Sequence, residues 1–165
     1  MKITDTALEE FKLVGIFVRT NNKNEFTPNL GKIPGNFNRY FGEKIFEKIQ
    51  HRVKPFVTYA VYTEYESDEN GEYTHFLGEE VSSFENQDTS LFKTITISKN
   101  SYLKFTSAKG KMPDIVINVW QKIWSMQHSE FHGKRNFLAD FELYDSRAID
   151  PENSEVDIYI GKSSY

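Results

Sequence analysis

The feature of this sequence that most constrains its fold is an order of elements that occurs twice. Runs rich in β-branched and aromatic residues predict strands, and apolar residues three and four positions apart predict helices. The chain accordingly gives strand, helix, strand, strand over residues 12–83 and a second unit of this kind over 92–161. We therefore expect an α+β fold, with pseudo-twofold units forming a mostly antiparallel sheet of about eight strands with two helices.

Within these units, the sequence predicts the position of each element. Asn70-Gly71 lies between two β-rich runs and indicates a hairpin. A Met-Pro-Asp sequence at 112–114 opens the second helix, on which Trp120 and Trp124 lie one turn apart. The expected helices are 36–50 and 112–126, and the expected strands are 11–20, 56–67, 73–83, 92–98, 102–107, 137–144 and 156–160. Because each half would need its partner to complete the sheet, we expect a single domain over 1–165.

Composition excludes several classes of protein. Cysteine is absent, which removes disulfides, thiolate zinc sites and cysteine nucleophiles and is typical of the reducing cytoplasm. No apolar run approaches the length of a membrane-spanning helix, and the N-terminus has no secretory signal. The net charge of −4 predicts no nucleic-acid surface. Aromatic residues reach 15%, which indicates either an aromatic-rich core or a pocket lined by Tyr and Trp.

Motifs for metal or cofactor chemistry are weak. His128 and His132 have the spacing of helical metal ligands, but they follow the end of the predicted helix, and we interpret them as exposed loop histidines. Glycine-rich phosphate loops, dinucleotide fingerprints and the nucleophile elbow of serine hydrolases are all absent from the sequence. We therefore expect no bound metal and no cofactor.

Acidic residues inside a predicted strand are more informative. Alternation over 137–144 puts Phe141 with Leu143 on one face, which we expect to pack under the helices. Asp140, Glu142 and Tyr144 lie on the other face. These acids either face water or place a carboxylate in an aromatic cavity. A buried carboxylate needs a partner, and a cation held over Tyr and Trp rings would supply it.

Several segments together resemble one known family. The stretch YAVYTEYESDENGEYTHFLGEEV at 59–81 is similar to a stretch of the gyrase-inhibitor-like effector-binding domains of bacterial transcription activators, which also occur as stand-alone proteins. Phe37 stands where that family usually has Trp. Further similar segments are IPGNF at 33–37, ISKNSY at 97–102, WQKIW at 120–124, DFELYD at 140–145 and VDIYI at 156–160.

The resemblance implies a fold and a site. The family has two pseudo-twofold units with an aromatic pocket between them, and a Glu in its Phe-Glu-x-Tyr strand contacts cationic ligands. That Glu corresponds to Glu142, and the resemblance also supports Tyr144. Strand alternation and helix spacing suggest the other walls. The expected ligand-binding residues are Glu142, Tyr62, Tyr144, Trp120 and Tyr159.

Three functions compete at this point. The first is a stand-alone effector-binding protein for an amphipathic, cationic small molecule, which serves transcriptional regulation or the sequestration of drugs or toxins. The second is a hydrolase of reactive electrophiles with Glu142 as general base. The third is a protein-binding inhibitor of the gyrase-inhibitor type. Haem binding is disfavoured because, with the exception of His75, no His lies near a predicted pocket strand. No helix-turn-helix precedes Lys12, so we expect no direct DNA binding, and regulation would need a partner protein.

Overall fold

The structure, a computed structural model, describes residues 1–164 and is built on one sheet in which every pair of strands is antiparallel. It confirms the α+β class. The strands are β1 (Lys2–Leu8), β2 (Phe11–Asn21), β3 (Thr58–Thr63), β4 (Glu72–Val81), β5 (Lys93–Ile97), β6 (Asn100–Thr106), β7 (Lys134–Arg135), β8 (Ala139–Tyr144) and β9 (Asp157–Ser163). The helices are α1 (Asn22–Glu25), α2 (Ile33–Gly42) and α3 (Asp114–Ser125), with single 3-10 turns at η1 (Ile45–Lys48), η2 (His128–Phe131) and η3 (Ser146–Ala148). None of these helices is long and apolar enough to cross a membrane.

The order of strands shows the expected twofold relation. The order is β1-β6-β9-β8-β3-β4-β2-β5, and the short β7 pairs with β9. One half of the sheet therefore contains β8, β9 and β6, and the other half contains β3, β4 and β2 in the corresponding places. The pairing of β3 with β8 joins the two halves at the centre.

The two outermost strands correct the predicted boundaries of the units. We expected residues 92–98 to belong to the second unit, but β5 pairs with β2 of the first. Its counterpart in the other half is β1, which pairs with β6 and was not predicted. β1 lies at an edge of the sheet and most of its residues are exposed. An edge strand of this kind has little of the apolar patterning from which strands are recognised.

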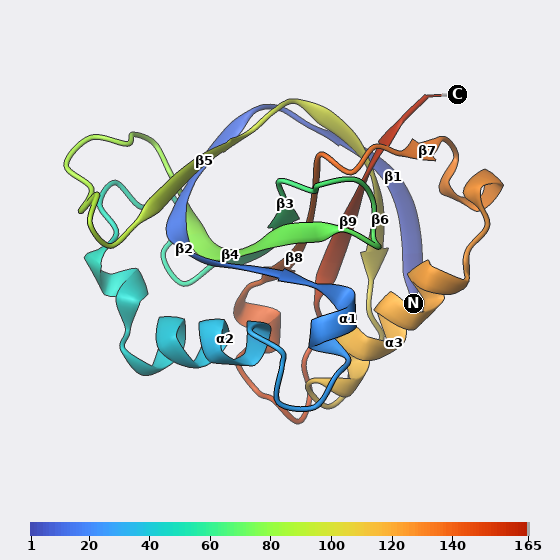
Figure 1. The fold of residues 1–165 in the computed structure, drawn as a ribbon, viewed down its shortest axis with the longest axis horizontal. Helices are drawn as coiled ribbons and strands as arrows, with labels where there is room; N and C mark the ends of the chain where they lie inside the picture. The colour runs from blue at the N-terminus through green and yellow to red at the C-terminus, as the bar shows by residue number, and fades with distance from the viewer. Residues whose placement is uncertain (165) are drawn as a thin grey trace.

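Both long helices lie on one side of the sheet, as predicted (Figure 1). On α2, Tyr40 is buried against Val14 and Leu77 of the first half. On α3, the buried stripe Ile115, Val119 and Ile123 packs in a cluster with strand residues of the second half.

The opposite face of the sheet has no helix packed on it in the described part of the chain. The sheet curls, and its own strands enclose a core that contains Tyr59, Phe76 and Phe141. The prediction that the Phe141 face packs under the helices is therefore wrong. The apolar partners of this face come from distant strands of the curled sheet, and alternation within one strand does not show this.

The first helix is shorter than predicted. Instead of spanning 36–50 it covers Ile33–Gly42, and Lys44 then takes a left-handed conformation with φ of 49°. The change of direction places Ile45 and Ile49, which are almost fully buried, in the same core cluster as Tyr40. The apolar spacing that predicted one helix therefore continues through a break in the helix.

The predicted hairpin is present, but its loop is longer than an Asn-Gly turn. β3 ends at Thr63, and β4 begins at Glu72. Glu64 has φ of 51°, a left-handed conformation uncommon for this residue type. The alternation of side chains between the two faces of the sheet therefore ends at Glu64.

Two glycines allow β2 and β4 to approach closely. Gly15 lies opposite Gly78 in the ladder. A Cβ atom on Gly15 would lie 1.9 Å from the carbonyl oxygen of Leu77, and one on Gly78 would lie 2.2 Å from that of Val14. Both clashes are with backbone, so no side-chain movement can relieve them.

We predict that Gly15→Ala destabilises the protein, because the added methyl group forces β2 and β4 apart. The expected loss is about 1–3 kcal/mol in the free energy of unfolding, the usual cost of overpacking a core. Urea denaturation followed by circular dichroism measures it. Gly35→Ala is the control, because a Cβ at Gly35 meets no atom within 4 Å and Ala favours the helix. Equal stability of the two variants would contradict the prediction.

Candidate functional site

The Glu142 carboxylate lies between the two halves of the molecule and is 3% exposed. Its Oε2 accepts hydrogen bonds from Tyr62 Oη at 3.0 Å and from Trp120 Nε1 at 2.7 Å. Its Oε1 accepts one from Tyr144 Oη at 2.5 Å. These donors come from β3, α3 and β8, so the carboxylate joins the central strands to the second long helix.

The charge of Glu142 is not balanced by a nearby cation. Among residues 1–164, no Lys, Arg or His forms an ion pair with it. Burial raises the pKa of the carboxyl group above its ordinary value, and the hydrogen bonds from Tyr144, Trp120 and Tyr62 oppose that rise. Burial also raises the pKa values of Tyr62 and Tyr144 far above the ordinary tyrosine value, so both phenols remain donors at neutral pH.

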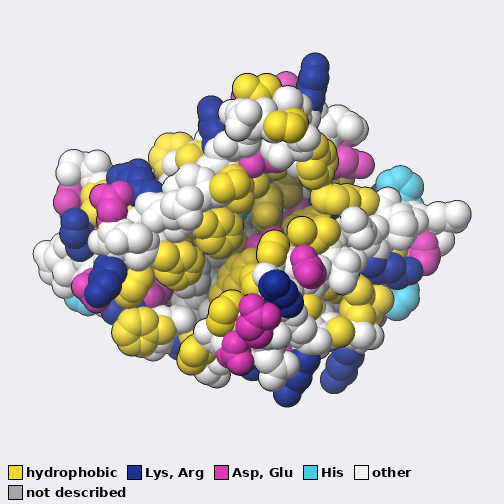
Figure 2. Space-filling view, turned by 90° about the horizontal axis from the view of Figure 1, so that it is seen from below, with side chains coloured by type: hydrophobic (Ala, Val, Ile, Leu, Met, Phe, Trp, Pro, Cys, Tyr) yellow, Lys and Arg dark blue, Asp and Glu magenta, His cyan; other side chains and the backbone are white. Residues whose placement is uncertain are grey.

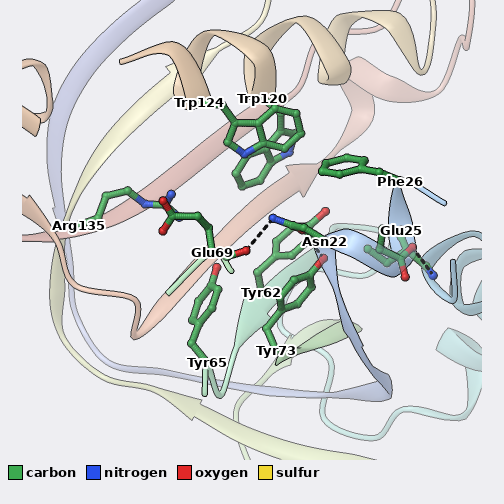
Figure 3. A pocket seen from close by; sticks show the side chains of 11 residues that line it. Asn22, Glu25, Phe26, Tyr62, Tyr65, Glu69, Tyr73, Trp120, Trp124 and Arg135 are labelled. Carbon is green, nitrogen blue, oxygen red and sulfur yellow. Dashed lines mark hydrogen bonds between the residues drawn. The ribbon is translucent and has the colours of Figure 1, made fainter. Parts of the chain in front are cut away.

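An aromatic cavity lies in front of Glu142. It has a volume of about 120 Å³. Tyr62 and Trp120 form part of its wall, and their rings meet edge to face at 5.2 Å. Glu142 itself lies behind them. Figure 3 shows Trp120 and Trp124 on one side of the cavity and the Tyr side chains on the other. The lining residues are Asn22, Glu25, Phe26, Ile33, Tyr62, Tyr65, Glu69, Tyr73, Trp120, Trp124 and Arg135.

A second, wider cavity of about 470 Å³ adjoins the first on the same face of the molecule. Figure 2 shows this face hollowed at its centre, with hydrophobic side chains around the hollow. Five residues line both cavities, which therefore form one continuous groove. The shared residues are Asn22, Phe26, Glu69, Trp124 and Arg135.

The structure brings four of the five predicted site residues together. Tyr62, Trp120 and Tyr144 all contact Glu142, although Tyr144 lies beside the carboxylate and not in the cavity wall. Tyr159 does not join them. It pairs with Phe141 in the register of β8 and β9, so it lies on the opposite face of the sheet. There its ring stacks on that of Phe141 at 4.6 Å.

A second buried carboxylate, that of Asp140, lies two residues before Glu142. Its Oδ2 accepts from Tyr65 Oη at 2.6 Å and from Arg135 Nη2 at 2.8 Å, and its Oδ1 accepts from the Gly161 amide at 2.8 Å. Asp140, unlike Glu142, thus has a cationic partner. Its role is to hold Tyr65 and Arg135 in the cavity wall.

At the other end of the cavity, Glu25 has two roles. It lines the cavity, and its carboxylate accepts from the backbone amides of Lys32 at 2.8 Å and Ile33 at 3.1 Å. These amides belong to the start of α2, whose N-cap residue makes no side-chain bond. Glu25 therefore caps α2 from a distance.

Next to Glu25, Phe26 meets Trp124 of α3 edge to face at 5.4 Å and so connects the two halves across the cavity.

His75 supports the site from behind. It is fully buried, its ring lies 5.2 Å from that of Tyr62, and its Nδ1 lies 3.1 Å from Nδ2 of Asn36. Burial lowers the pKa of His75 to about 3, so the ring is neutral at physiological pH. It packs behind Tyr62 and does not line either cavity.

Several cavity residues were not predicted from the sequence. Alternation along the expected strand 56–67 would put Tyr65 on the face opposite Tyr62, but the left-handed backbone at Glu64 brings it to the same cavity. Phe26 and Arg135 come from segments without a regular pattern. Trp124 was noted only as the helical neighbour of Trp120. The i, i+4 spacing of the two Trp residues on α3 was a usable signal, because it places both rings on one face.

Of the two histidines His128 and His132, His128 lines the second cavity, whereas His132 lines neither cavity. His132 Nδ1 lies 2.9 Å from Asp5 Oδ2 at the surface. Within residues 1–164, no group of three or more His, Asp or Glu side chains is arranged to hold a metal ion.

Comparison with known proteins agrees with this architecture. The chain belongs to the Cass2 family of integron-associated effector binding proteins, whose model matches residues 6–161. The Bacillus subtilis (strain 168) protein YobU, named as a transcriptional regulator, is 29% identical over 158 residues, which cover 94% of each chain.

Solved structures show the same fold. An integron cassette protein from Vibrio cholerae superposes with a TM-score of 0.75 at 24% identity, covering 98% of this chain and 95% of that one. The protein SAV2435, solved bound to tetraphenylphosphonium, superposes with a TM-score of 0.77 at 16% identity, covering 99% and 94%.

We predict that the free energy of unfolding depends on pH through the buried Glu142 carboxyl group. Since its pKa is raised in the folded state, the folded protein binds a proton that the unfolded chain releases. The stabilising contribution of the Glu142 carboxyl group is therefore complete below the ordinary Glu pKa of about 4.3. It is lost as the pH rises through the raised pKa of the folded state, by up to about 1.4 kcal/mol per pH unit.

Urea unfolding of the wild type and of Glu142→Gln between pH 4 and pH 8 tests this dependence. The stability of the wild type relative to the variant should fall as pH rises through that window and then level off. Parallel curves over the whole range would show that the carboxyl group has the same pKa in the folded and unfolded chain.

Proposed function

We propose that this protein is a stand-alone effector-binding protein that takes an amphipathic cation into the groove between its halves, with Glu142 as the charge anchor. The observation that carries the proposal is a buried carboxylate held by three neutral donors and by no cation among residues 1–164. A charge in this state gains most from a positively charged ligand, because attraction is strong where water is excluded.

The aromatic wall favours the same class of ligand. Tyr62 and Trp120 each offer a ring to the cavity while their polar atoms hold Glu142. A cation placed over these rings would gain cation–π attraction and would also feel the carboxylate behind them. Glu25 and Glu69 add further negative charge to the wall. The structurally similar SAV2435, bound to tetraphenylphosphonium, supports this choice of ligand class.

The family description and the name of YobU support a regulatory role for the binding event. We propose that the protein acts in the cytoplasm, either by reporting the ligand to a separate partner protein or by sequestering it. The hydrolytic alternative gains no support from the geometry. Three of the roughly four acceptor positions of the Glu142 carboxylate already receive hydrogen bonds, which leaves it poorly placed as a general base.

Isothermal titration calorimetry with tetraphenylphosphonium at neutral pH tests this proposal. We expect the wild type to bind and Glu142→Gln to bind more weakly by roughly 1–3 kcal/mol, the range of charge-assisted contacts. The affinity for neutral triphenylphosphine oxide should fall much less on the same substitution, because this compound carries no net charge.

Glu152→Gln is the matched control, since it removes the same charge from an exposed loop outside both cavities. It should bind as the wild type does. Equal losses for the cation and the neutral compound would mean that Glu142 shapes the groove without selecting charge. Absence of any binding to the wild type would overturn the proposal.

A further inference from the structure

An exposed aromatic surface lies at the end of α2 that points away from the groove. The first residue of α2, Ile33, lines the inner cavity, and the helix then runs away from α1 (Figure 1). At its other end are the rings of Phe41, of Phe46 in η1 and of Phe56 in the loop before β3, which together we name the Phe56 surface. The ring centre of Phe46 lies 6.2 Å from that of Phe41 and 5.9 Å from that of Phe56. Phe56 is 71% exposed and Phe41 is 45% exposed, and a continuous exposed patch of this kind is typical of a binding surface.

A buried ion pair holds these rings in place. Glu79 of β4 is fully buried, and its carboxylate accepts from Arg52 Nε at 3.0 Å and from Arg52 Nη2 at 2.7 Å. The same carboxylate accepts from the backbone amide of Phe56 at 3.3 Å. The guanidinium carbon of Arg52 lies 5.0 Å from the ring centre of Phe56 and 5.8 Å from that of Phe46. Two of the three rings therefore pack on a cation that is itself fixed to the core.

The backbone of Phe56 takes a conformation that its own side chain disfavours. Its φ is 72°, in the left-handed region, where a bulky side chain is an outlier. Because most of the ring is exposed, the fold gains little from its burial. Strained residues of this kind cluster at sites that bind other molecules. A contact outside this chain explains why a Phe occupies the position.

The segment that forms the Phe56 surface is basic, although the protein is acidic. Residues 39–56 contain five Lys or Arg and two Glu, a net charge of +3, whereas the whole chain has a net charge of −4. Lys44, Lys48 and Lys54 are exposed, and within residues 1–164 none of them forms an ion pair. Their charges complement an acidic partner.

The pattern of these charges indicates that the partner is a protein. Glu43 and Glu47 lie among the basic residues and would repel a uniform row of phosphates or anionic lipid headgroups. A protein can set a carboxylate opposite each Lys and place none opposite the two Glu residues. Aromatic residues and Arg at the centre, with charges around them, are also typical of interfaces between proteins.

We infer that the Phe56 surface docks an acidic segment of a second protein. Apolar side chains of that segment pack on the three rings, and its carboxylates pair with Lys44, Lys48 and Lys54. The residues of this surface line neither cavity, so the docking site is separate from the ligand groove.

A random copolymer of Glu and Tyr, in which Glu predominates, is the probe for this chemistry. Fluorescence anisotropy of the dye-labelled copolymer, titrated with the wild type, measures its affinity. We expect the copolymer to bind, and poly-Glu of the same length to bind about tenfold more weakly, because poly-Glu offers no ring to the surface. The affinity for the copolymer should fall as salt is added, since salt screens ion pairs between exposed groups.

Phe56→Asn separates binding from folding. The affinity for the copolymer should fall by about tenfold, the usual effect of removing a central aromatic side chain. Because Asn tolerates the left-handed conformation better than Phe, this variant should melt no lower than the wild type. Replacing Lys48 and Lys54 together by Gln should weaken binding by several fold and reduce its dependence on salt.

Phe17→Thr is the matched control. Phe17 is also exposed and its ring centre lies 5.0 Å from the Nζ of Lys93, but it belongs to β2 and not to the Phe56 surface. Thr removes the ring and keeps a residue that favours strands. This variant should bind the copolymer as the wild type does.

Several outcomes would overturn the inference. They are no binding of the copolymer to the wild type, equal binding of the copolymer and poly-Glu, undiminished binding by Phe56→Asn, or a markedly lower melting temperature of that variant. Tighter binding of duplex DNA, or of vesicles of phosphatidylcholine and phosphatidylserine, than of the copolymer would assign the surface to phosphate groups instead. Self-association of the wild type in sedimentation, lost in Phe56→Asn, would assign it to a second copy of this chain. Each of these results leaves phosphonium binding in the groove, and with it the proposed function, to be decided by its own experiment.

Discussion

The pairing of β3 with β8 is the interaction on which the rest of the molecule depends. It joins the two halves of the sheet, and its register sets Tyr62 opposite Asp140 and Ala60 opposite Glu142. Ala60 is buried in the core cluster of α2, and both long helices pack on this face of the sheet. The groove is thus formed where the two units meet and would not exist in either one alone.

Burial of the Glu142 carboxylate disfavours its charged form and so costs folding stability. Three neutral donors orient the carboxylate, but none of them cancels its charge. Asp140, two residues away, shows the alternative, since Arg135 neutralises it and the group then acts as structural support. Two carboxylates on one strand face therefore have different roles because only one has a cationic partner within the described chain.

Sequence reasoning found the parts of the site that depend on local regularity. Strand alternation put Glu142 and Tyr144 on one face, and helical spacing paired Trp120 with Trp124. It could not place Tyr159, because the register between β8 and β9 is set by contacts between distant segments. It could not place Tyr65 either, since the left-handed residue before it is a Glu and not the Gly or Asn that would have signalled a reversal. β1 was missed because an exposed edge strand needs few apolar residues.

The double role of Glu25 affects how this groove can change during evolution. Because its carboxylate both lines the cavity and caps α2, a substitution that alters ligand preference at this position also removes a helix cap. Tyr62 and Trp120 are constrained in the same way by their bonds to Glu142. Phe26 and Trp124 are exposed, and their rings meet across the groove without a hydrogen bond to Glu142. Divergence in ligand range among descendants of this protein should therefore accumulate at that pair of rings, while the floor of the groove stays constant.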